Sequence, residues 1–170
     1  MHISCAVSQT SSLGLVLVAA TDRGVCFVAL HDDPDRLCLE LHDRFPGAVL
    51  HEAGPEFSAT VARVVACIND SGQPFELPLY LLGTPFQQQV WQALREIPCG
   101  TTATYRDIAV RIGKPEAVRA VGTACGANPI AIIVPCHRVV RSDGGLGGFC
   151  WGLERKRLLL EREATAVNGA

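Results

Sequence analysis

The sequence predicts an α+β protein with two domains, one covering residues 1–83 and the other residues 84–170. The first half contains two apolar segments of strand length followed by helical patterns, whereas the second half contains capped helical patterns around one short apolar run. The charge also changes between the halves. The first 83 residues carry 4 Lys and Arg against 10 Asp and Glu, a net charge of −6, and the remainder carries 11 against 7, a net charge of +4. This asymmetry is expected if only the second domain contacts a polyanion.

The first domain is expected to open with a β-hairpin. Residues 14–20 and 25–30 are apolar, and the sequence Thr-Asp-Arg-Gly between them favours a turn. A helix follows from the cap at Asp33-Pro34 to about Phe45, and a second helix is expected over residues 56–68. Residues 69–78 then form a polar, proline-containing connection, which places the domain boundary near Leu82-Gly83.

Capping motifs mark the expected starts of helices in the second domain. Thr84-Pro85 opens a helix that ends before Pro98, and Thr104 with Asp107 has capping-box spacing for a helix over residues 105–112. A tight turn at Gly113 leads to another helix over residues 115–125. Two helices joined by a short glycine-containing turn form the helix-turn-helix pattern, which also occurs in many proteins that never contact DNA. The second helix exposes Arg119 as a single cation among small residues, so its backbone can approach a nucleic-acid groove closely.

The chemically reactive stretch is residues 130–140, which read IAIIVPCHRVV. Residues 130–134 are expected to form a buried strand or extended segment that delivers Cys136 beside His137. A thiol near an imidazole can be held partly as thiolate, the nucleophilic form, although a buried structural Cys beside a surface His is the simpler interpretation of such a pair. Residues 141–149 are rich in Gly and Asp and are expected to form a mobile loop or wing. A last helix is expected over residues 153–163, with residues 164–170 frayed.

Composition indicates a soluble, cytoplasmic protein. The longest apolar runs are far too short to cross a bilayer, and the N-terminus does not resemble a signal peptide. The 8 cysteines include no C-x-x-C pair and mostly lie in apolar surroundings, so they are expected to be reduced core residues rather than a disulfide framework.

The motif Pro135-Cys136-His137-Arg138-Val139 closely resembles the active-site signature of the O6-alkylguanine-DNA alkyltransferases. The second half matches that family almost continuously, and the looser match of the first half is most similar to the alkyltransferase half of the bacterial adaptive-response (Ada) proteins. The zinc-binding regulatory half of Ada proteins has no counterpart in the sequence, so repair without regulation is expected. The other matching segments are 83–91, 97–100, Tyr105, 119–122, Asn128-Pro129 and 149–152.

The resemblance implies a ribonuclease H-like first domain and a winged helix-turn-helix-like second domain. It also implies a single-use repair reaction, in which an O6-alkylguanine, and as a second substrate O4-methylthymine, is flipped out of double-stranded DNA. Cys136 then takes the alkyl group irreversibly as a thioether. The resemblance implies a monomer that needs no cofactor and does not bind membranes.

The resemblance also assigns roles to catalytic residues. His137 would act as the base through a bridging water, and Glu163 would orient this imidazole and favour its protonated form, which favours the thiolate. Without the resemblance, Glu163 would be interpreted as a solvated residue at a helix end. Tyr105 would donate a proton to the departing guanine, and its alternative is a core aromatic. Asn128 would tie the recognition helix to the Cys136 loop, where the alternative is an ordinary Asn-Pro turn.

For DNA, the resemblance implies that Arg119 fills the space left by the flipped nucleotide while the helix docks in the minor groove. The alternative for Arg119 is a solvated helix charge. Further DNA contacts are expected from Ala120, Gly122, Thr123 and Arg138, and the walls of the base pocket from Pro135, Val139, Gly147, Gly148, Phe149 and Cys150.

No metal is expected, but a structural zinc site is a second possibility. Cys5, Cys26 and His31 resemble three zinc ligands of some relatives in order and spacing, whereas the stretch from Asn69 to Pro85 offers no fourth histidine. Two thiols packed in the core and a surface histidine explain the same residues without metal.

Two other classes of function compete with alkyl transfer. A non-catalytic binder of alkylated DNA would lack the acceptor, so the presence of Cys136 argues against it. A turnover cysteine hydrolase would use Cys136, His137 and a carboxylate, but such enzymes separate their Cys and His in sequence, and this function leaves the helix-turn-helix unexplained.

Overall fold

The computed structural model describes residues 1–10 and 12–168, and the mixed α+β prediction is confirmed. The chain divides into two compact units. The first unit comprises residues 1–82 together with 129–133, and the second comprises residues 83–128 and the chain from Val134 onward. None of the helices within the described residues is both long and apolar enough to cross a membrane.

The first unit is built on a four-stranded sheet of order β3-β2-β1-β4. The predicted hairpin is confirmed: β2 and β3 pair antiparallel, with a register shift between Ala19 and Ala20. Gly24 closes its turn with φ 140°, and a Cβ at this position would lie 2.4 Å from the carbonyl oxygen of Pro78, so only glycine fits. The strands are β1 (His2–Gln9), β2 (Leu15–Thr21), β3 (Gly24–His31) and β4 (Val49–Glu52).

Two of these strands, β1 and β4, were not predicted. β1 pairs antiparallel with β2 and parallel with β4. All four residues of β4 are exposed, and β1 mixes polar with apolar side chains, so neither segment has a clear apolar alternation. β1 is held by pairing with β2 of the hairpin, and β4 by pairing with β1. Such pairing between distant segments cannot be inferred from the local sequence.

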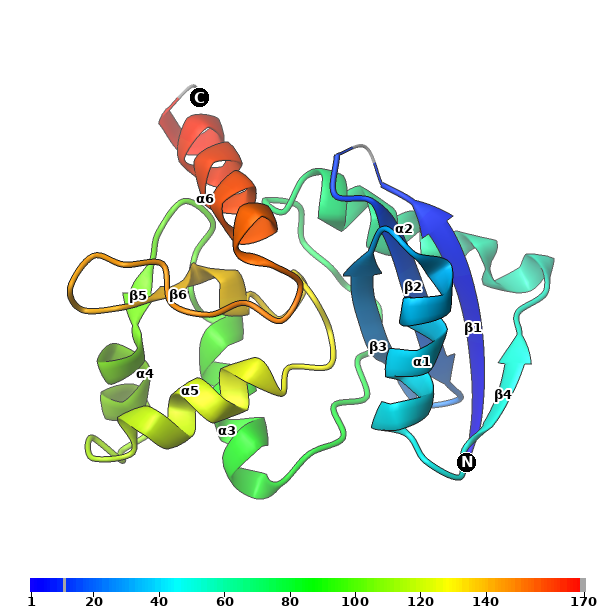
Figure 1. Cartoon of the computed structure of the whole chain (residues 1–170), viewed down its shortest axis with the longest axis horizontal. Helices are drawn as coiled ribbons and strands as arrows, with labels where there is room; N and C mark the ends of the chain where they lie inside the picture. Colours follow the sequence, from blue (N-terminus) through cyan, green and yellow to red (C-terminus); the bar gives the residue numbers. More distant parts are fainter. Residues whose placement is uncertain (11, 169–170) are drawn as a thin grey trace. The chain divides into compact units, whose positions relative to one another are not determined.

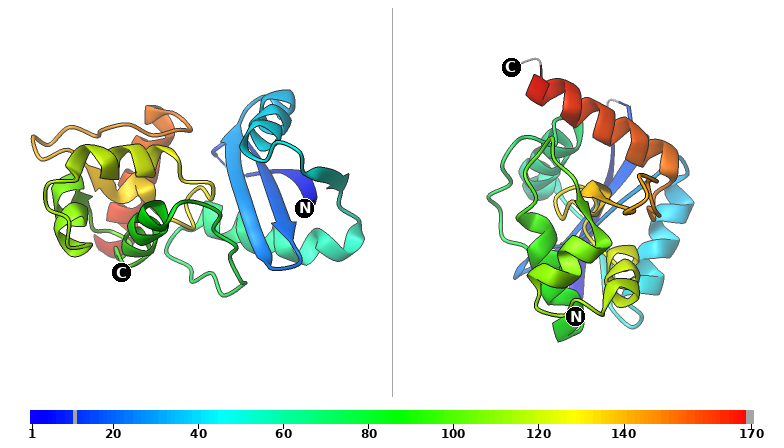
Figure 2. Two further views of the ribbon diagram at one scale, coloured as in Figure 1. Left: turned by 90° about the horizontal axis from the view of Figure 1, so that it is seen from below. Right: turned by 90° about the vertical axis from the view of Figure 1, so that its left-hand side faces the viewer.

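The two predicted helices of this unit cover opposite faces of the sheet (Figures 1 and 2). Helix α1 (Pro34–Arg44) packs on β2 and β3 and begins where the Asp33 side chain accepts a hydrogen bond from the backbone of Asp35. Helix α2 (Ser58–Asn69) packs on β1 and β2. It starts two residues later than predicted, because a 3₁₀ turn, η1 (Pro55–Phe57), occupies its expected first turn.

The second unit contains four helices and a short parallel strand pair among its described residues. Both predicted N-terminal caps are confirmed, and Thr84 with Gln87 and Thr104 with Asp107 each form a reciprocal capping box. The elements are α3 (Pro85–Arg95), α4 (Tyr105–Arg111), α5 (Val118–Gly126), α6 (Leu153–Asn168), β5 (Ala103–Thr104) and β6 (Val139–Val140).

Two helix boundaries differ from the prediction. Helix α5 begins at Val118 rather than at Pro115, because residues 114–117 form a separate turn in which the Ala117 amide donates to the Lys114 carbonyl oxygen. Helix α6 continues to Asn168, so the prediction of fraying from residue 164 is wrong for residues 164–168, and residues 169–170 lie outside the described range.

The apolar run 130–134 is not one continuous strand. Ile130 and Ala131 pair with Val28 of β3 in the first unit, and the chain then turns at Ile132, whose φ is 69°. A β-branched residue rarely adopts this left-handed conformation. The burial of the run is confirmed for all but Ile133, but the expected strand is replaced by a bridge followed by a turn.

Candidate active site

The predicted recognition helix presents the expected surface. Along α5, Val121, Ala124 and Cys125 are buried, whereas Arg119, Ala120 and Thr123 are exposed. Gly122 is half-buried, and a Cβ there would lie 3.9 Å from the Tyr105 ring, so Tyr105 lies directly beside the helix. Helix α3 holds α5 in place through a hydrogen bond of 2.9 Å from Trp91 Nε1 to the carbonyl oxygen of Ala124.

Cys136 lies at the first position of a 3₁₀ turn, η2 (Cys136–Arg138), directly after the buried Pro135. Its thiol is held by Asn128, the second residue after α5. The Asn128 side-chain amide donates to the Cys136 Sγ at 3.2 Å and to the Val134 carbonyl oxygen at 2.8 Å. This arrangement matches the expectation that Asn128 connects the end of the recognition helix to the cysteine loop.

Burial dominates the proton affinity of this thiol. Cys136 is 4% exposed, and burial raises its pKa to about 12, although the hydrogen bond from Asn128 and the positive charge of Lys156 act in the opposite direction. The resting side chain is therefore a thiol rather than a thiolate at neutral pH. Alkylation chemistry at this position needs a base that removes the thiol proton during the reaction.

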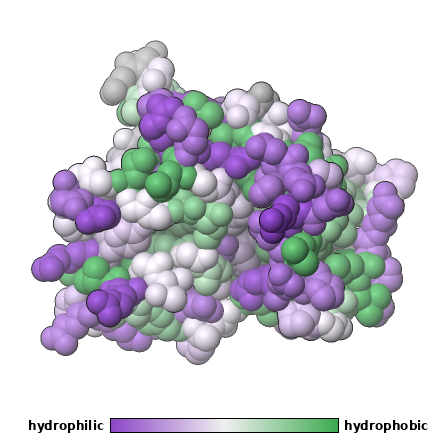
Figure 3. All heavy atoms as spheres, in the orientation of Figure 1, coloured by the Kyte–Doolittle hydropathy of each residue, from purple (hydrophilic) through white to green (hydrophobic). Residues whose placement is uncertain are grey.

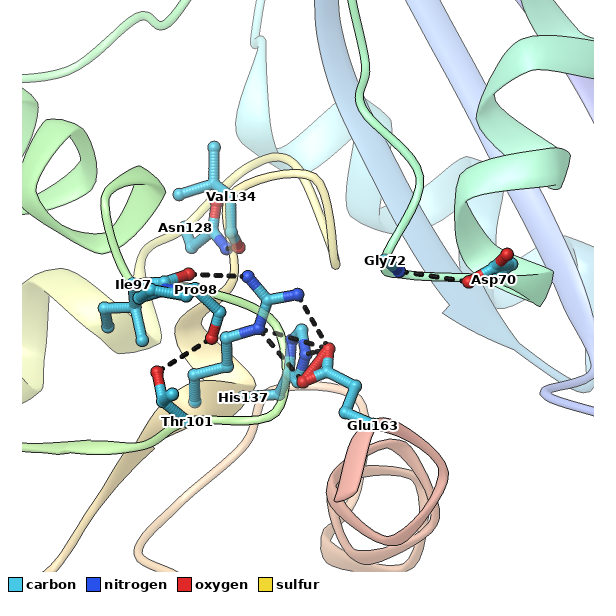
Figure 4. A network of polar contacts seen from close by, with 10 residues as sticks. Asp70, Gly72, Ile97, Pro98, Thr101, Asn128, Val134, His137 and Glu163 are labelled. Carbon is cyan, nitrogen blue, oxygen red and sulfur yellow. Dashed lines mark hydrogen bonds and ion pairs between the residues drawn. The ribbon is translucent and has the colours of Figure 1, made fainter. Parts of the chain in front are cut away.

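A buried imidazole with a free acceptor position lies next to the cysteine. His137 is fully buried, and its Nε2 atom lies 2.7 Å from a carboxylate oxygen of Glu163 on α6, as Figure 4 shows. A carboxylate partner accepts from Nε2–H, which leaves Nδ1 as the basic nitrogen of the neutral ring. His137 Nδ1 has no hydrogen-bond partner within the part of the chain that the structure describes.

Glu163 also binds Arg138. The guanidinium donates to both carboxylate oxygens at distances of 2.8 to 3.1 Å, and its Nη1 donates to the Ile97 carbonyl oxygen at 2.8 Å (Figure 4). Arg138 is only 7% exposed. This contradicts the expectation that Arg138 contacts DNA, because the motif places its side chain inward on Glu163.

Burial favours the neutral form of His137. Burial lowers the pKa of His137, and the positive charges of Arg138 and Lys156 lower it further, against the raising effect of Glu163. Burial alone would raise the pKa of Glu163, but its bonds to His137 and Arg138 outweigh burial and hold that pKa at about 2. The carboxylate is thus ionised and compensated by Arg138. The expected imidazolium that would stabilise a thiolate is not favoured by this geometry.

A cavity of about 810 Å³ opens onto the thiol. Tyr105 from α4 forms part of its lining, together with the loop that follows β6. Burial raises the pKa of Tyr105, so its phenol stays protonated and can donate. The lining residues are Tyr105, Gly122, Cys125, Gly126, Cys136, Arg141, Gly145, Leu146, Gly147, Gly148, Phe149, Cys150 and Leu153.

Most of the predicted pocket residues are in this lining, but two are not. Pro135 and Val139 are buried and do not line the cavity, so the prediction is wrong for these two residues. The predicted loop 141–149 is confirmed as a segment without helix or strand, closed by a turn in which the Arg141 amide donates to the Gly145 carbonyl oxygen. Glycines and half-buried apolar groups make the cavity lining only weakly polar, and Figure 3 shows pale and green areas between hydrophilic margins on this unit.

Lys156 was missed by sequence reasoning. This side chain of α6 is fully buried, and its Nζ donates to the carbonyl oxygens of Val139 at 2.6 Å and Gly148 at 3.0 Å. The sequence shows Lys156 between Arg155 and Arg157, which suggests a solvated basic stretch. Helical spacing could have indicated that Lys156 is buried, because Lys156 and Glu163 are seven residues apart and share one face of α6.

No metal-binding cluster of three or more His, Cys, Asp or Glu residues occurs within residues 1–10 and 12–168. The three residues weighed as zinc ligands have other partners. The Cys26 thiol donates to Ala19, Cys5 donates to the carbonyl oxygen of His51, and His31 Nδ1 accepts from the backbone of Asp33. The zinc alternative therefore has no support from the geometry.

Comparison with known proteins shows the family to which this chain belongs. Residues 85–165 match the family model described as 6-O-methylguanine DNA methyltransferase, DNA binding domain. The inducible methylated-DNA–protein-cysteine methyltransferase of Bacillus subtilis is 43% identical over 150 residues, which cover 88% of this chain and 84% of that protein. The chain belongs to the methylated-DNA–protein-cysteine methyltransferase family. The resemblance inferred from the Pro-Cys-His-Arg-Val motif is therefore confirmed.

A second relative and a solved structure extend the comparison. The bifunctional transcriptional activator/DNA repair enzyme Ada of Escherichia coli is 54% identical over 152 residues, 89% of this chain but 43% of that protein, so the chain spans less than half of its length. The crystal structure of Mycobacterium tuberculosis OGT in complex with DNA has a TM-score of 0.76 at 37% identity, covering 97% of this chain and 94% of that one. Both similarities extend over most of this chain.

Proposed function

We propose that this protein repairs DNA by transferring the alkyl group of O6-alkylguanine, and as a second substrate O4-methylthymine, irreversibly to Cys136. The observation that carries the proposal is the thiol itself. Cys136 opens onto a weakly polar cavity, with a base on one side and Asn128 holding its sulfur. Names of relatives that act on methylated DNA and a neighbour bound to DNA support the same activity.

The geometry supports a single displacement. The Cys136 thiol gives its proton, through a water molecule, to Nδ1 of His137, which Glu163 holds by its other nitrogen. The sulfur attacks the alkyl carbon, so the S–C bond forms while the bond from that carbon to O6 breaks and its electron pair stays on the guanine. Tyr105 donates a proton to the leaving base, which balances the proton lost by the thiol. The thioether is stable, so each molecule acts once.

We propose that the second unit binds double-stranded DNA as a winged helix-turn-helix. In this proposal α5 docks in the minor groove, where the small residues Ala120, Gly122 and Thr123 permit close approach. Arg119 enters the base stack and offsets part of the few kcal/mol that flipping a nucleotide costs. The flipped base occupies the cavity beside Tyr105 and the wall formed by Gly147–Cys150. The loop 141–149 is the proposed wing.

The first unit is proposed to be a ribonuclease H-like support domain that takes no part in the chemistry. We further propose that the protein acts as a cytoplasmic monomer without a cofactor. None of the 8 cysteines, all of which lie within the described residues, forms a disulfide bond, which fits a reducing compartment.

The test is a duplex carrying one O6-methylguanine with a labelled methyl group. Wild-type protein should transfer the label to the peptide that contains Cys136, one label per molecule, and restore guanine. Cys136→Ala should take up none, whereas Cys38→Ala, which removes an exposed thiol on α1, should behave as wild type. Tight binding without transfer would indicate the non-catalytic binder, and repeated turnover on an ester would indicate the hydrolase. Either result from the wild-type protein rejects the proposal.

A further inference from the structure

A buried ammonium group without a carboxylate partner lies behind the active site. Lys156 is fully buried, and its Nζ is hydrogen-bonded to two carbonyl oxygens, those of Val139 and Gly148. No ion pair links Lys156 to Asp or Glu within the described residues. A buried cation is costly without an opposite charge, and a Met or Leu of similar length would avoid this cost. The arrangement therefore calls for an anion that appears during function.

The other charges of the site cancel. Glu163 is negative and is bound by the positive Arg138, so these two groups together contribute no net charge around His137. Arg157, which follows Lys156 on α6, is exposed and forms ion pairs with Glu154 and Glu161. Lys156 is then the positive charge that remains near the acceptor.

The groups that act electrostatically on Cys136 can be named one by one. They are the thiols of Cys125 on α5 and Cys150 on the loop, together with the ammonium group of Lys156 on α6. Tyr105 on α4 also interacts with Cys136, but its phenol is neutral at physiological pH. Burial lowers the pKa of Lys156, and the electrostatic interactions with Cys136 and Cys125 act in the opposite direction. The geometry explains this coupling, because the Nζ of Lys156 binds Val139, three residues after Cys136, and Gly148 in the cavity wall.

We infer that Lys156 is a positioning residue whose positive charge stabilises the Cys136 thiolate as the proton leaves, so that His137 works as a neutral base rather than as a standing imidazolium. The same ammonium group fixes the wall of the base cavity to the cysteine loop. This inference rests on the proposed alkyl transfer to Cys136. Two buried residues of α6, Lys156 and Glu163 seven positions after it, then act on the site. Lys156 stabilises the thiolate, and Glu163 holds the imidazole of His137.

The two tasks of Lys156 can be separated by substitution. Lys156→Gln retains a hydrogen-bond donor for the carbonyl oxygens but removes the charge, whereas Lys156→Met removes both. Arg157→Gln removes a positive charge from the exposed side of the same helix and serves as the matched control. Circular dichroism and thermal unfolding would establish that each variant is folded before its reactivity is compared.

The readout is the rate of Cys136 alkylation by iodoacetamide at pH 7 without DNA, followed by mass spectrometry of the peptide that contains this residue. Loss of one nearby charge should lower the thiolate fraction at this pH about tenfold in Lys156→Gln. The alkylation rate should fall only about threefold, because a more basic thiolate is also intrinsically more nucleophilic. Arg157→Gln should match the wild type. Lys156→Met should show the same fall in alkylation rate, with a further loss of methyl transfer from DNA caused by the loosened wall.

The inference is overturned if folded Lys156→Gln retains the wild-type alkylation rate at pH 7, because hydrogen bonding alone would then explain the residue. It is also overturned if Arg157→Gln lowers this rate equally, since the effect would then be general surface charge. The proposed function fails in a different way: wild-type protein would take no methyl group from O6-methylguanine DNA, whatever its rate with iodoacetamide.

Discussion

The side-chain amide of Asn128 lies 3.2 Å from the sulfur of Cys136, which makes it the polar contact between the end of α5 and the acceptor. The same amide binds the Val134 carbonyl oxygen at 2.8 Å, so one residue fixes both the backbone and the thiol of the loop. An N–H donor aimed at sulfur stabilises a thiolate more than a thiol. Asn128 therefore links α5, the helix proposed to bind DNA, to the thiol of Cys136.

Replacing Asn128 by Ala should weaken both stability and transfer. The unfolding free energy should fall by about 0.5–1.5 kcal/mol, because the buried Val134 carbonyl oxygen loses one donor and keeps only the Cys136 amide. The methyl-transfer rate should fall about 10- to 100-fold through the lost bond to the thiolate. Urea unfolding and single-turnover kinetics measure the two effects. Asn128→Asp should be slower still, because a carboxylate repels the thiolate, and equal rates for the two variants would contradict this role.

Replacing Glu163 by Gln should change how stability depends on pH. The pKa of Glu163 is held at about 2 in the folded state against 4.5 ordinarily, so ionised Glu163 contributes stability that is present above pH 4.5 and is lost as pH falls toward 2. This contribution is on the order of 3 kcal/mol. Glu163→Gln should lose it at pH 7 and differ much less from wild type at pH 2.5 in urea unfolding. A stability difference that is constant between these pH values would show that the carboxylate charge is not responsible.

Adding one methyl group at Gly147 should disturb Tyr105. Gly147 has φ 74°, and a Cβ there would lie 2.5 Å from the Tyr105 hydroxyl oxygen, so Gly147→Ala must move either the loop or the phenol. Methyl transfer should slow by about tenfold or more, as expected when a proton donor is misplaced. Gly148→Ala adds the same group where no atom lies within 4 Å and should have a smaller effect. Single-turnover rates of the two variants test this order.

Replacing Arg119 by Ala should affect duplex substrates specifically. If Arg119 fills the space of the flipped nucleotide, Arg119→Ala should transfer methyl groups from duplex DNA about tenfold more slowly or worse. The rate with free O6-methylguanine base should stay within about twofold, because no base pair has to open. Arg36→Ala, an exposed arginine on α1, is the control for general charge loss. Equal losses on duplex and free base would place Arg119 in the chemistry instead.

Local signals explain why much of the fold was predictable. The caps at Asp33, Thr84 and Thr104 and the turn before Gly24 depend on neighbouring residues only, and the structure has them where the sequence indicates. β1 and β4 were missed because their stability comes from pairing with distant strands. The start of α5 differs because residues 114–117 form a local turn, and the turn at Ile132 follows the pairing of Ile130 and Ala131 with the distant Val28.

The sequence by itself determined the family and the candidate catalytic residues, because Pro-Cys-His-Arg-Val and the segments around it have a recognisable order. Tertiary structure decided what surrounds them. It turned Arg138 inward onto Glu163, left Nδ1 of His137 as the open position of the imidazole, and buried Lys156 against Val139 and Gly148. Burial and the direction of a side chain arise when α6 packs on the cysteine loop, and these contacts set the charges that act on Cys136.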